Sequence, residues 1–309
     1  AASDVYKRQG QNNVQGAADM GCQPHQGAGY FEVSDEKNQK FCSEKYGVTH
    51  PTKAGLKIPQ MFDAAINKDI KGIWIIGEDI VQTDPNSAHV VEAMNSLELL
   101  VVQEIFMSET AKLATVVLPG TTFLEKDGTF TNTERRVQRV NRAVPPLPGT
   151  KPDGVIVTDM MQKLGFDQPD YDADQVLAEI ADIVPFFKGI TRDRLGKFGL
   201  QWPVKEDGTD TQILHTKEFK LGKGRLKSFD WKESTEIKNN QKDYPLILTT
   251  SRVLQHYNAA TMTRRTNNIN IVDEDILLTH PKDAADRDLN TGDIGRLYSG
   301  RGEVALKVE

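Results

Sequence analysis

Polar side chains follow two short apolar runs that each predict a buried strand. Gly77, Glu78 and Asp79 come after the first run, and Gln103 and Glu104 come after the second. Ligands of open parallel sheets bind beyond the carboxyl ends of the strands, so we expect these side chains to lie near one another at a binding edge. Carboxylates there accept hydrogen bonds from ribose hydroxyls or guanine N–H groups. Alternatively, the acidic residues cap the helices that follow.

A second group of polar side chains follows a later apolar run. It contains Arg252, His256, Tyr257 and Asn258. A guanidinium pairs well with phosphate, and an imidazole binds an anion or a ring nitrogen. The group is therefore either a second anion-binding segment or a polar loop with one incidental histidine.

Other common site motifs are missing from the sequence. There is no G-x-G-x-x-G or Walker A run, so a standard nicotinamide or ATP site is not supported. The two cysteines, Cys22 and Cys42, lack zinc-site or iron–sulfur spacing. The remaining histidines are scattered and suggest no metal site. Four arginines, Arg135, Arg136, Arg139 and Arg142, form either an anion patch or a solvated docking face.

Composition and charge narrow the class of protein. The chain has 309 residues, 38 Lys plus Arg and 44 Asp plus Glu, which leaves a net charge of -6. A nucleic-acid partner is not expected, because nucleic-acid surfaces are usually basic. No apolar run approaches the roughly 20 residues of a membrane span. The length fits about two domains.

Alternating helical and strand patterns place the first polar group in an α/β domain. Apolar spacing predicts a helix from 58 to 66, and continuous apolar runs predict strands at 72–76, 97–102 and 115–118. Helices near 90–94 and 108–114 connect them. The order β-α-β-α-β is half of a doubly wound, Rossmann-like parallel sheet. The preceding residues 10–57 are Gly-rich and predicted to be loop.

The later part of the chain changes in character. A Val/Arg alternation predicts a strand within 134–142, helices are expected at 153–164 and 173–183, and 185–240 is irregular. We divide the chain into an α/β region, 10–240, and a β-rich domain, 241–309. The second contains four expected strands and a small helix, and we expect a β-barrel that the terminus cuts open. The ranges are 245–250, 275–279, 294–299 and 303–308 for the strands and 283–290 for the helix.

Both ends of the sequence suggest a piece of a longer protein. Residues 1–9 have no amphipathic or signal-peptide pattern and resemble translated adapter sequence, so we treat them as non-native. The last residues, 304–309, look like the middle of a strand. We therefore expect an internal fragment of a larger chain.

Taken together, several segments resemble the catalytic (alpha) subunits of molybdopterin-dependent formate dehydrogenases. The resemblance is collinear over 10–309, and the opening Gly-Gln-Asn-Asn-Val-Gln-Gly distinguishes it from nitrate reductases, which share single pieces. Its segments are 10–21, 76–79, 82–85, 102–111, 117–120, 128–138, 251–252 and 256–257. The resemblance implies a molybdopterin-binding α/β region followed by a truncated dinucleotide-binding barrel of the double-psi type.

The family resemblance also implies a cofactor and a reaction. Two molybdopterin guanine dinucleotides hold molybdenum or tungsten, and a [4Fe-4S] cluster in the N-terminal part takes electrons as formate is oxidised to carbon dioxide. The metal-ligand Cys or selenocysteine, the catalytic His and a catalytic Arg precede this segment in the family. The chain would therefore supply cofactor-binding surface but no catalytic residue and no metal ligand, and we expect no formate dehydrogenase activity from it alone.

By position, the resemblance assigns roles to twelve residues. Gln11 would lie near the metal end of a pterin, and Asp153 on the second guanine. The others would line one dinucleotide (Gly77, Glu78, Asp79, Thr83, Gln103 and Glu104) or contact pterin or phosphates (Arg252, His256, Tyr257 and Asn258). The family usually has Asp where this chain has Glu104, and Arg where it has Gln9.

Two other interpretations remain within the same superfamily, and a plain nucleotide-binding module is a third. One is another molybdopterin oxidoreductase, of the nitrate reductase type. The other is the non-catalytic large iron–sulfur subunit of NADH dehydrogenase, which need not keep the dinucleotide-binding residues. The expected partners are formate and iron–sulfur or NAD-linked electron-transfer subunits, and the expected location is cytoplasmic.

Overall fold

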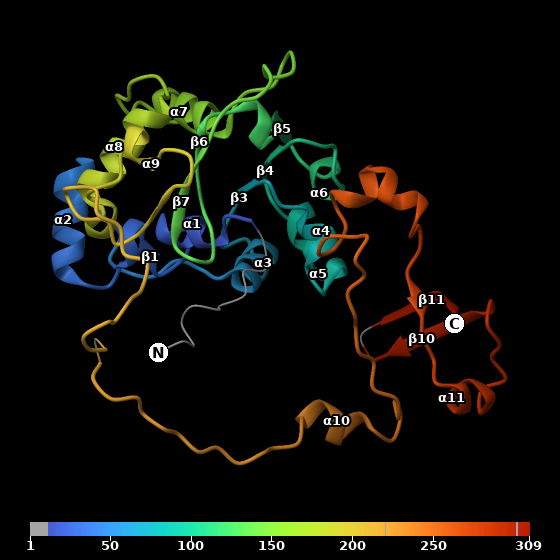
Figure 1. The fold of residues 1–309 in the computed structure, drawn as a ribbon. Helices are drawn as coiled ribbons and strands as arrows, with labels where there is room; N and C mark the ends of the chain where they lie inside the picture. Colours follow the sequence, from blue (N-terminus) through green and yellow to red (C-terminus); the bar gives the residue numbers. More distant parts are fainter. Residues whose placement is uncertain (1–11, 220, 301) are drawn as a thin grey trace. The chain divides into compact units, whose positions relative to one another are not determined.

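The computed structural model describes residues 12–219, 221–300 and 302–309 (Figure 1). The chain divides into two compact units, 1–223 and 224–309, and each is described by itself. The domain boundary expected from the sequence stays a prediction. The helices and strands of the first unit are α1 Val14–Asp19, β1 Gln26–Gly27, β2 Phe31–Glu32, α2 Glu36–Tyr46, α3 Ile58–Ile66, β3 Gly72–Ile76, α4 Ile80–Thr83, α5 Ser87–Asn95, β4 Leu99–Glu104, α6 Glu109–Lys112, β5 Val116–Pro119, β6 Gly128–Thr131, β7 Arg136–Val140, α7 Asp153–Lys163, α8 Ala173–Ile183, α9 Arg192–Leu195 and β8 Leu200–Gln201.

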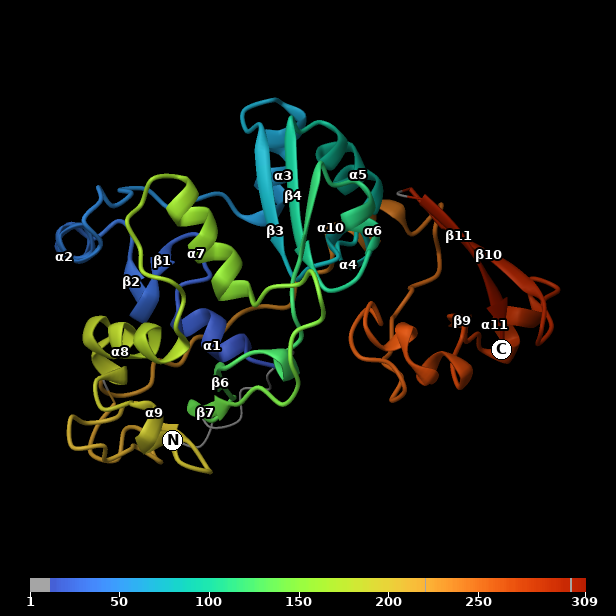
Figure 2. The ribbon, with the colours of Figure 1, turned by 90° about the horizontal axis from the view of Figure 1, so that it is seen from above.

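A three-stranded parallel sheet forms the centre of the first unit (Figure 2). Its order is β3-β4-β5, and the predicted strands and helices of this region are confirmed. Leu100 and Val102 on β4 are buried against helices α3, α4, α5 and α6. The alternation of side chains along a strand sends Gln103 to the opposite face. This face is only half covered, since Ile76 is 49% and Leu99 is 46% exposed.

A second hydrophobic core lies under the hairpin β6–β7. The hairpin is antiparallel and pairs with β8, and the expected strand within 134–142 is therefore confirmed. Val137 of β7 is fully buried against Leu177 of α8, Val184, and Leu195 of α9. This core joins the hairpin to the helices that follow it in the chain.

The interpretation of 10–57 as loop is wrong, because the segment contains α1 and α2. Helix α2 buries only Cys42 and so lacks a clear apolar period. Its ends carry the signal instead. The Asp35 side chain accepts from the first-turn N–H groups, and Gly47 closes the helix in the left-handed conformation.

Helix α1 is tied to distant segments through the fully buried Asp19. Its carboxylate accepts hydrogen bonds from the Tyr30 hydroxyl at 2.7 Å, from Gln15 Nε2 at 3.0 Å and from Trp202 Nε1 at 2.8 Å. Burial raises the pKa of the Asp19 carboxyl, and these bonds oppose the rise. The network fixes α1 against residues that lie far along the chain.

The second unit contains α10 Thr235–Asn240, β9 Ile276–Leu277, α11 Pro281–Ala285, β10 Ile294–Ser299 and β11 Gly302–Val308. The strands form one sheet of order β10-β11-β9, and the described residues close no barrel. The expected strand at 245–250 is not formed, and Leu246, Ile247 and Leu248 are exposed. An apolar run becomes a strand only where another strand forms hydrogen bonds with its backbone N–H and C=O groups.

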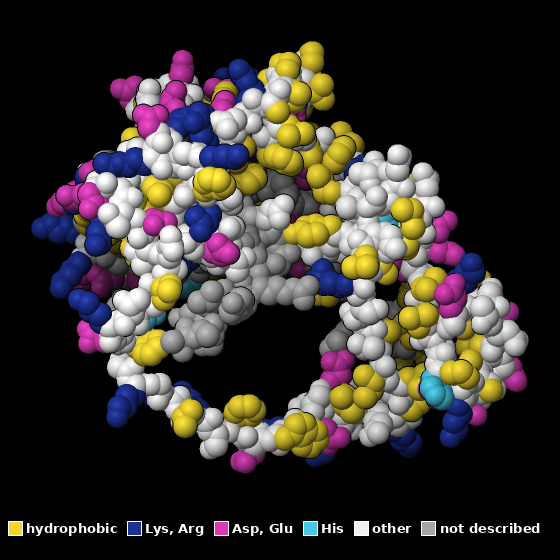
Figure 3. Space-filling view, in the orientation of Figure 1, with side chains coloured by type: hydrophobic (Ala, Val, Ile, Leu, Met, Phe, Trp, Pro, Cys, Tyr) yellow, Lys and Arg dark blue, Asp and Glu magenta, His cyan; other side chains and the backbone are white. Residues whose placement is uncertain are grey.

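Large apolar side chains, coloured yellow, also lie at the surface seen in Figure 3. Leu226, Phe229 and Trp231 are more than four-fifths exposed in an irregular segment. No helix among the described residues is long and apolar enough to cross a membrane.

The central strand gives the first testable prediction. Leu100→Ala lowers the free energy of unfolding by about 2–5 kcal/mol, because it opens a cavity among packed helices. The matched control, Leu99→Ala, alters a half-exposed neighbour on the other face and costs about 1 kcal/mol or less. Urea unfolding followed by circular dichroism measures both. Equal losses would contradict the one-sided burial of β4.

Candidate functional site

The carboxyl edge of the β3-β4-β5 sheet gathers six of the sequence-predicted residues. Gly77 ends β3 and donates its N–H to the Gln103 carbonyl at 2.9 Å. Its φ of 64° lies in the left-handed region, which glycine adopts without strain. No atom lies within 4 Å of where a Cβ would stand. The chain therefore turns away from the sheet here and leaves open space at the strand end.

Asp79 is buried, and both oxygens of its carboxylate accept hydrogen bonds from the protein. Its carboxylate accepts from the Thr110 N–H at 2.9 Å and from the Thr110 hydroxyl at 2.8 Å. Gln82 Nε2 donates to it at 2.9 Å, and the Glu109 N–H lies at 3.4 Å. The carboxylate thus satisfies the free N–H groups at the start of α6. The alternative interpretation, in which the acidic residues cap helices, therefore applies to Asp79. The helix that it caps follows β4 rather than β3.

Glu78 and Glu104 point a different way from Asp79. Glu78 accepts a hydrogen bond from the Thr83 hydroxyl at the sheet edge, where Thr83 is exposed and Glu78 is half-buried. Glu104 accepts from the N–H of Ile105 at 2.7 Å. Neither carboxylate is buried, so both can present oxygen atoms to a ligand at the strand ends.

A chain of polar contacts links the strand ends to helix α7. Gln103 is 1% exposed, and its Nε2 donates to Asp153 Oδ1 at 2.7 Å. Lys126 forms an ion pair with the other oxygen of Asp153. The structure thus brings Gln103 and Asp153 together, 50 residues apart in the sequence, although the sequence-based roles assign them to different dinucleotides.

Two buried oxygens near the polar contacts of Gln103, Asp153 and Lys126 have no hydrogen-bond partner among the described residues. They are Gln103 Oε1 and Thr121 Oγ1. A buried acceptor without a donor is costly, so an unmatched one next to an open strand edge favours a ligand that brings N–H or O–H donors. Guanine carries such donors on its N2 amino group. The site therefore fits the guanine end of a dinucleotide.

Sequence reasoning missed Lys126 and Thr121. Both follow β5 in a loop with no periodic pattern, and their link to Asp153 crosses 27 residues of chain from Lys126. Lys126 Nζ also reaches the Thr121 carbonyl at 3.4 Å. The only sequence signal was their place just beyond a third predicted strand end.

The second unit holds the other four predicted residues. His256 Nε2 donates to the Val272 carbonyl at 2.7 Å, and its Nδ1 lies 3.0 Å from the Thr263 hydroxyl. Because a carbonyl only accepts, Nε2 is the donor in the contact with Val272. The imidazole therefore has a structural role in this state of the chain.

Arg252 and Asn258 contact each other close to this histidine in the sequence. Arg252 Nη1 donates to Asn258 Oδ1 at 2.7 Å, and the guanidinium keeps its other donors. Tyr257 is 47% exposed. These three side chains remain accessible, and their contact with pterin or phosphate stays a prediction.

Two further expectations concern the metal end of the cofactor. Gln11 lies outside the described residues, as do 1–9. Within 12–219, 221–300 and 302–309, no three His, Cys, Asp or Glu side chains are grouped to hold a metal ion. Asn13 accepts from the Thr131 N–H at 2.9 Å, which ties the start of α1 to β6.

The four arginines of the hairpin do not form one patch. Arg135 folds back onto the Trp202 carbonyl, and Arg136 bonds Gln201 Oε1 at 2.9 Å. Burial lowers the pKa of Arg135. Arg139 instead lines a cavity, so the hairpin uses its arginines for separate tasks.

Comparison with known proteins identifies two family segments. Residues 4–163 match the family described as molybdopterin oxidoreductase, and residues 246–309 match the molybdopterin dinucleotide binding domain. The first match alone covers more than half of the chain.

Individual relatives are alpha subunits of formate dehydrogenases. The F420-dependent formate dehydrogenase subunit alpha of Methanocaldococcus jannaschii is 42% identical over 98% of this chain and 45% of its own length. Subunit alpha of F420-dependent formate dehydrogenase 1 from Methanococcus maripaludis is 38% identical over 99% and 45%. The chain thus spans less than half the length of these two relatives.

A solved structure supports the fold. Acetylene hydratase from Pelobacter acetylenicus superposes with a TM-score of 0.63 at 20% identity, over 88% of this chain and 40% of the hydratase chain. Similarity at this level concerns the fold alone.

The role of Asp79 gives the second prediction. Asp79→Ala removes the acceptor for the first turn of α6 and lowers the free energy of unfolding by about 1–3 kcal/mol. The control, Asp69→Ala, removes an exposed carboxylate beyond the other end of β3 and leaves stability within about 0.5 kcal/mol. Thermal unfolding monitored by circular dichroism distinguishes them. Unchanged stability in Asp79→Ala would show that its bonds to α6 contribute nothing.

Proposed function

Because the chain belongs to the molybdopterin oxidoreductase family, we propose that it is part of a formate dehydrogenase catalytic subunit, which oxidises formate to carbon dioxide. The observation that carries the proposal is the collinear similarity to formate dehydrogenase alpha subunits over 98% of the chain. The acceptor-lined sheet edge agrees with it, since a guanine dinucleotide needs such a surface. The chain contributes cofactor-binding surface to the whole enzyme.

The residues of the sheet edge would bind and orient the guanine end. Gln103 Oε1 and the free lone pairs of Asp153 accept from guanine N–H groups, while Lys126 balances the charge of Asp153. Glu78 and Glu104 face the more exposed side, where ribose hydroxyls can donate to them. When bound, the molybdopterin supplies the metal centre that receives the electrons of formate.

The finer features of the cofactor and its partners belong to the same proposal. The family resemblance suggests two dinucleotides, molybdenum or tungsten, and a [4Fe-4S] cluster held by other parts of the enzyme. It also suggests iron–sulfur or NAD-linked electron-transfer subunits, and the names of the methanogen relatives add F420 as an acceptor. We propose a cytoplasmic location.

The two alternative functions differ from this one in what the sheet edge must do. A nitrate reductase-type enzyme would use the same dinucleotide surface with another substrate. A non-catalytic NADH dehydrogenase subunit has no need of unmatched acceptors at the strand ends. Gln103 Oε1 and Thr121 Oγ1 therefore favour retained cofactor binding.

Guanine binding by the sheet edge is the third prediction. Isothermal titration of the 309-residue chain with GMP shows saturable binding, and AMP binds at least about tenfold more weakly, because adenine lacks the N2 donor. Asp153→Ala weakens GMP binding at least about tenfold, the size of a lost charge-assisted hydrogen bond.

The control for this titration lies on the same helix. Asp159→Ala removes a carboxylate of α7 that pairs with Lys151 at 2.6 Å and, among the described residues, bonds to neither Gln103 nor Lys126. It leaves GMP binding unchanged. Equal affinity for GMP and AMP would contradict guanine recognition by Gln103 and Asp153.

A chimaeric enzyme tests the reaction itself, as the fourth prediction. Residues 10–309 replace the matching segment of the Methanocaldococcus jannaschii alpha subunit, and formate-dependent viologen reduction is measured. The chimaera retains activity, and the same chimaera with Asp153→Ala loses it together with bound cofactor. A metal-loaded chimaera that reduces nitrate but does not oxidise formate would identify the nitrate reductase alternative.

A further inference from the structure

Glu125 is a buried carboxylate to which the proposed function gives no role. It lies in the loop after β5, between Thr121 and Lys126 of the sheet edge, and is only 7% exposed. A buried carboxylate is costly unless hydrogen-bond donors surround it. The donors to Glu125 come from two separate segments of the chain, so this side chain joins them.

One oxygen of the carboxylate fixes the loop itself. Glu125 Oε2 accepts hydrogen bonds from the Thr122 N–H and from the Thr122 hydroxyl, both at 2.9 Å. These bonds close the short 3₁₀ turn Phe123–Glu125. The turn sets the course of the backbone on both sides, and Lys126 Nζ reaches back to the Thr121 carbonyl at 3.4 Å.

The other oxygen holds a segment that lies further along the chain. Glu125 Oε1 accepts from the Leu147 N–H at 2.9 Å, across 22 residues. Beside this bond, the Leu124 carbonyl accepts from the N–H groups of Ala143 at 2.8 Å and Val144 at 3.1 Å. The segment 143–152, which we call the strap, is therefore fastened to the 3₁₀ turn at its start and at its middle.

The strap leads directly to Asp153. The Leu147 carbonyl accepts from the Thr150 N–H at 3.0 Å and from the Thr150 hydroxyl at 2.8 Å. The Lys151 N–H donates to the Pro119 carbonyl, at the end of β5, at 3.1 Å. Asp153 then begins α7. Little free backbone remains between these bonds and the helix, so the bond at Leu147 restricts where Asp153 stands.

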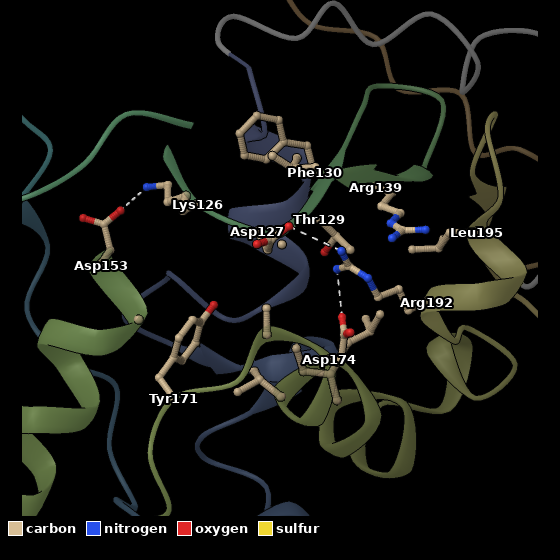
Figure 4. Close-up of a pocket in the computed structure, with 17 residues that line it drawn as sticks. Lys126, Asp127, Thr129, Phe130, Arg139, Asp153, Tyr171, Asp174, Arg192 and Leu195 are labelled. Carbon is tan, nitrogen blue, oxygen red and sulfur yellow. Dashed lines mark hydrogen bonds and ion pairs between the residues drawn. The ribbon is translucent and has the colours of Figure 1, made fainter. Parts of the chain in front are cut away.

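The 3₁₀ turn and the strap meet a second time at the ion pair of the sheet edge. Figure 4 shows Lys126 and Asp153 facing each other beside a cavity of about 260 Å³, which the hairpin β6–β7 and helices α8 and α9 also line. Lys126 follows the turn, and Asp153 follows the strap. Because Glu125 joins the turn to the strap, it sets the geometry in which the two partners meet.

The charge of Glu125 suits this task. Hydrogen bonds from the Thr122 N–H and the Leu147 N–H lower the pKa of its carboxyl. The group is therefore ionised at neutral pH, and both of its oxygens accept. A carboxamide has one acceptor oxygen and can hold only one of the two segments fully.

We infer that Glu125 is a positioning residue, which joins the 3₁₀ turn to the strap and thereby places Lys126 and Asp153 at the sheet edge. The inference rests on the proposed function in one respect, since the guanine-binding role of Asp153 comes from there. Glu125 acts through these two residues and not on the ligand.

A measurement without ligand tests the positioning itself. The side-chain amide of Gln103 donates to Asp153 at 2.7 Å, so its NMR signals in protein with isotope-labelled glutamine report where Asp153 stands. Loss of these signals in Gln103→Glu identifies them. We expect Glu125→Ala to move them toward their position in Asp153→Ala. Glu125→Gln gives an intermediate position, because one segment stays bound.

A matched control lies at the other end of β4. Glu98→Ala removes an exposed carboxylate that pairs with Lys71 at 2.8 Å, and it leaves the Gln103 signals unchanged. Circular dichroism confirms that each variant is folded. If Glu125→Ala does not fold, Glu125→Gln provides the same test with a smaller movement of the signals.

Titration with GMP then tests the consequence for binding. Glu125→Ala weakens GMP binding about fivefold or more, although it leaves Asp153 and Gln103 in the chain. In the double variant Glu125→Ala, Asp153→Ala, the affinity is no lower than in Asp153→Ala alone, because both changes remove the same contact. A general structural defect would instead add its effect to that of Asp153→Ala.

The two measurements distinguish this inference from the proposed function. If the unaltered chain does not bind GMP but the Gln103 signals respond to Glu125→Ala, the guanine assignment fails and the positioning of Asp153 by Glu125 is supported. Unchanged Gln103 signals in folded Glu125→Ala, or additive losses of GMP affinity in the double variant, would overturn the inference.

Discussion

The buried carboxylate of Asp79 is the contact on which the carboxyl edge of the sheet depends. It lies at the end of β3 but binds the first turn of α6, which follows β4. One side chain thereby links the connection after β3 to the connection after β4. It also accepts hydrogen bonds from backbone N–H groups that water cannot reach. Because Asp79 turns inward, its neighbour Glu78 is left at the surface with Gly77, where the strand ends stay open.

The opposite face of the sheet carries the chemistry that a ligand would meet. Gln103 emerges on this face because side chains alternate along β4, and it meets Asp153 at the start of α7. The ion pair with Lys126 and the bond from Gln103 do not use all the lone pairs of the Asp153 carboxylate. Unmatched acceptors thus lie next to a polar network that holds them in place, as expected of a preorganised site.

The same ion pair separates two kinds of surface. On one side, acceptors of the sheet edge face a guanine-like donor. On the other, a cavity with an apolar wall lies between the hairpin β6–β7 and helices α8 and α9. A single helix start, Asp153 followed by Gly154, serves both, since Asp153 holds the network and Gly154 seats the Tyr171 ring. Substitutions at Asp153 or Gly154 should therefore alter both the sheet edge and the cavity.

Local patterns in the sequence determined the strands β3, β4 and β5, the helices between them, and the polar residues at the strand ends. These features follow from the periodicity of neighbouring residues, which a sequence displays directly. The α2 helix was missed because its signal lies in the caps Asp35 and Gly47 rather than in an apolar face.

Only the tertiary structure decided which polar residues meet. Lys126 reaches Asp153 across 27 residues, and Trp202 reaches Asp19 across 183. It also decided that Asp79 faces inward and Glu78 outward, and that 245–250 does not pair as a strand. Such outcomes depend on the partners that packing supplies from distant segments, and no local pattern records which partner will be within reach.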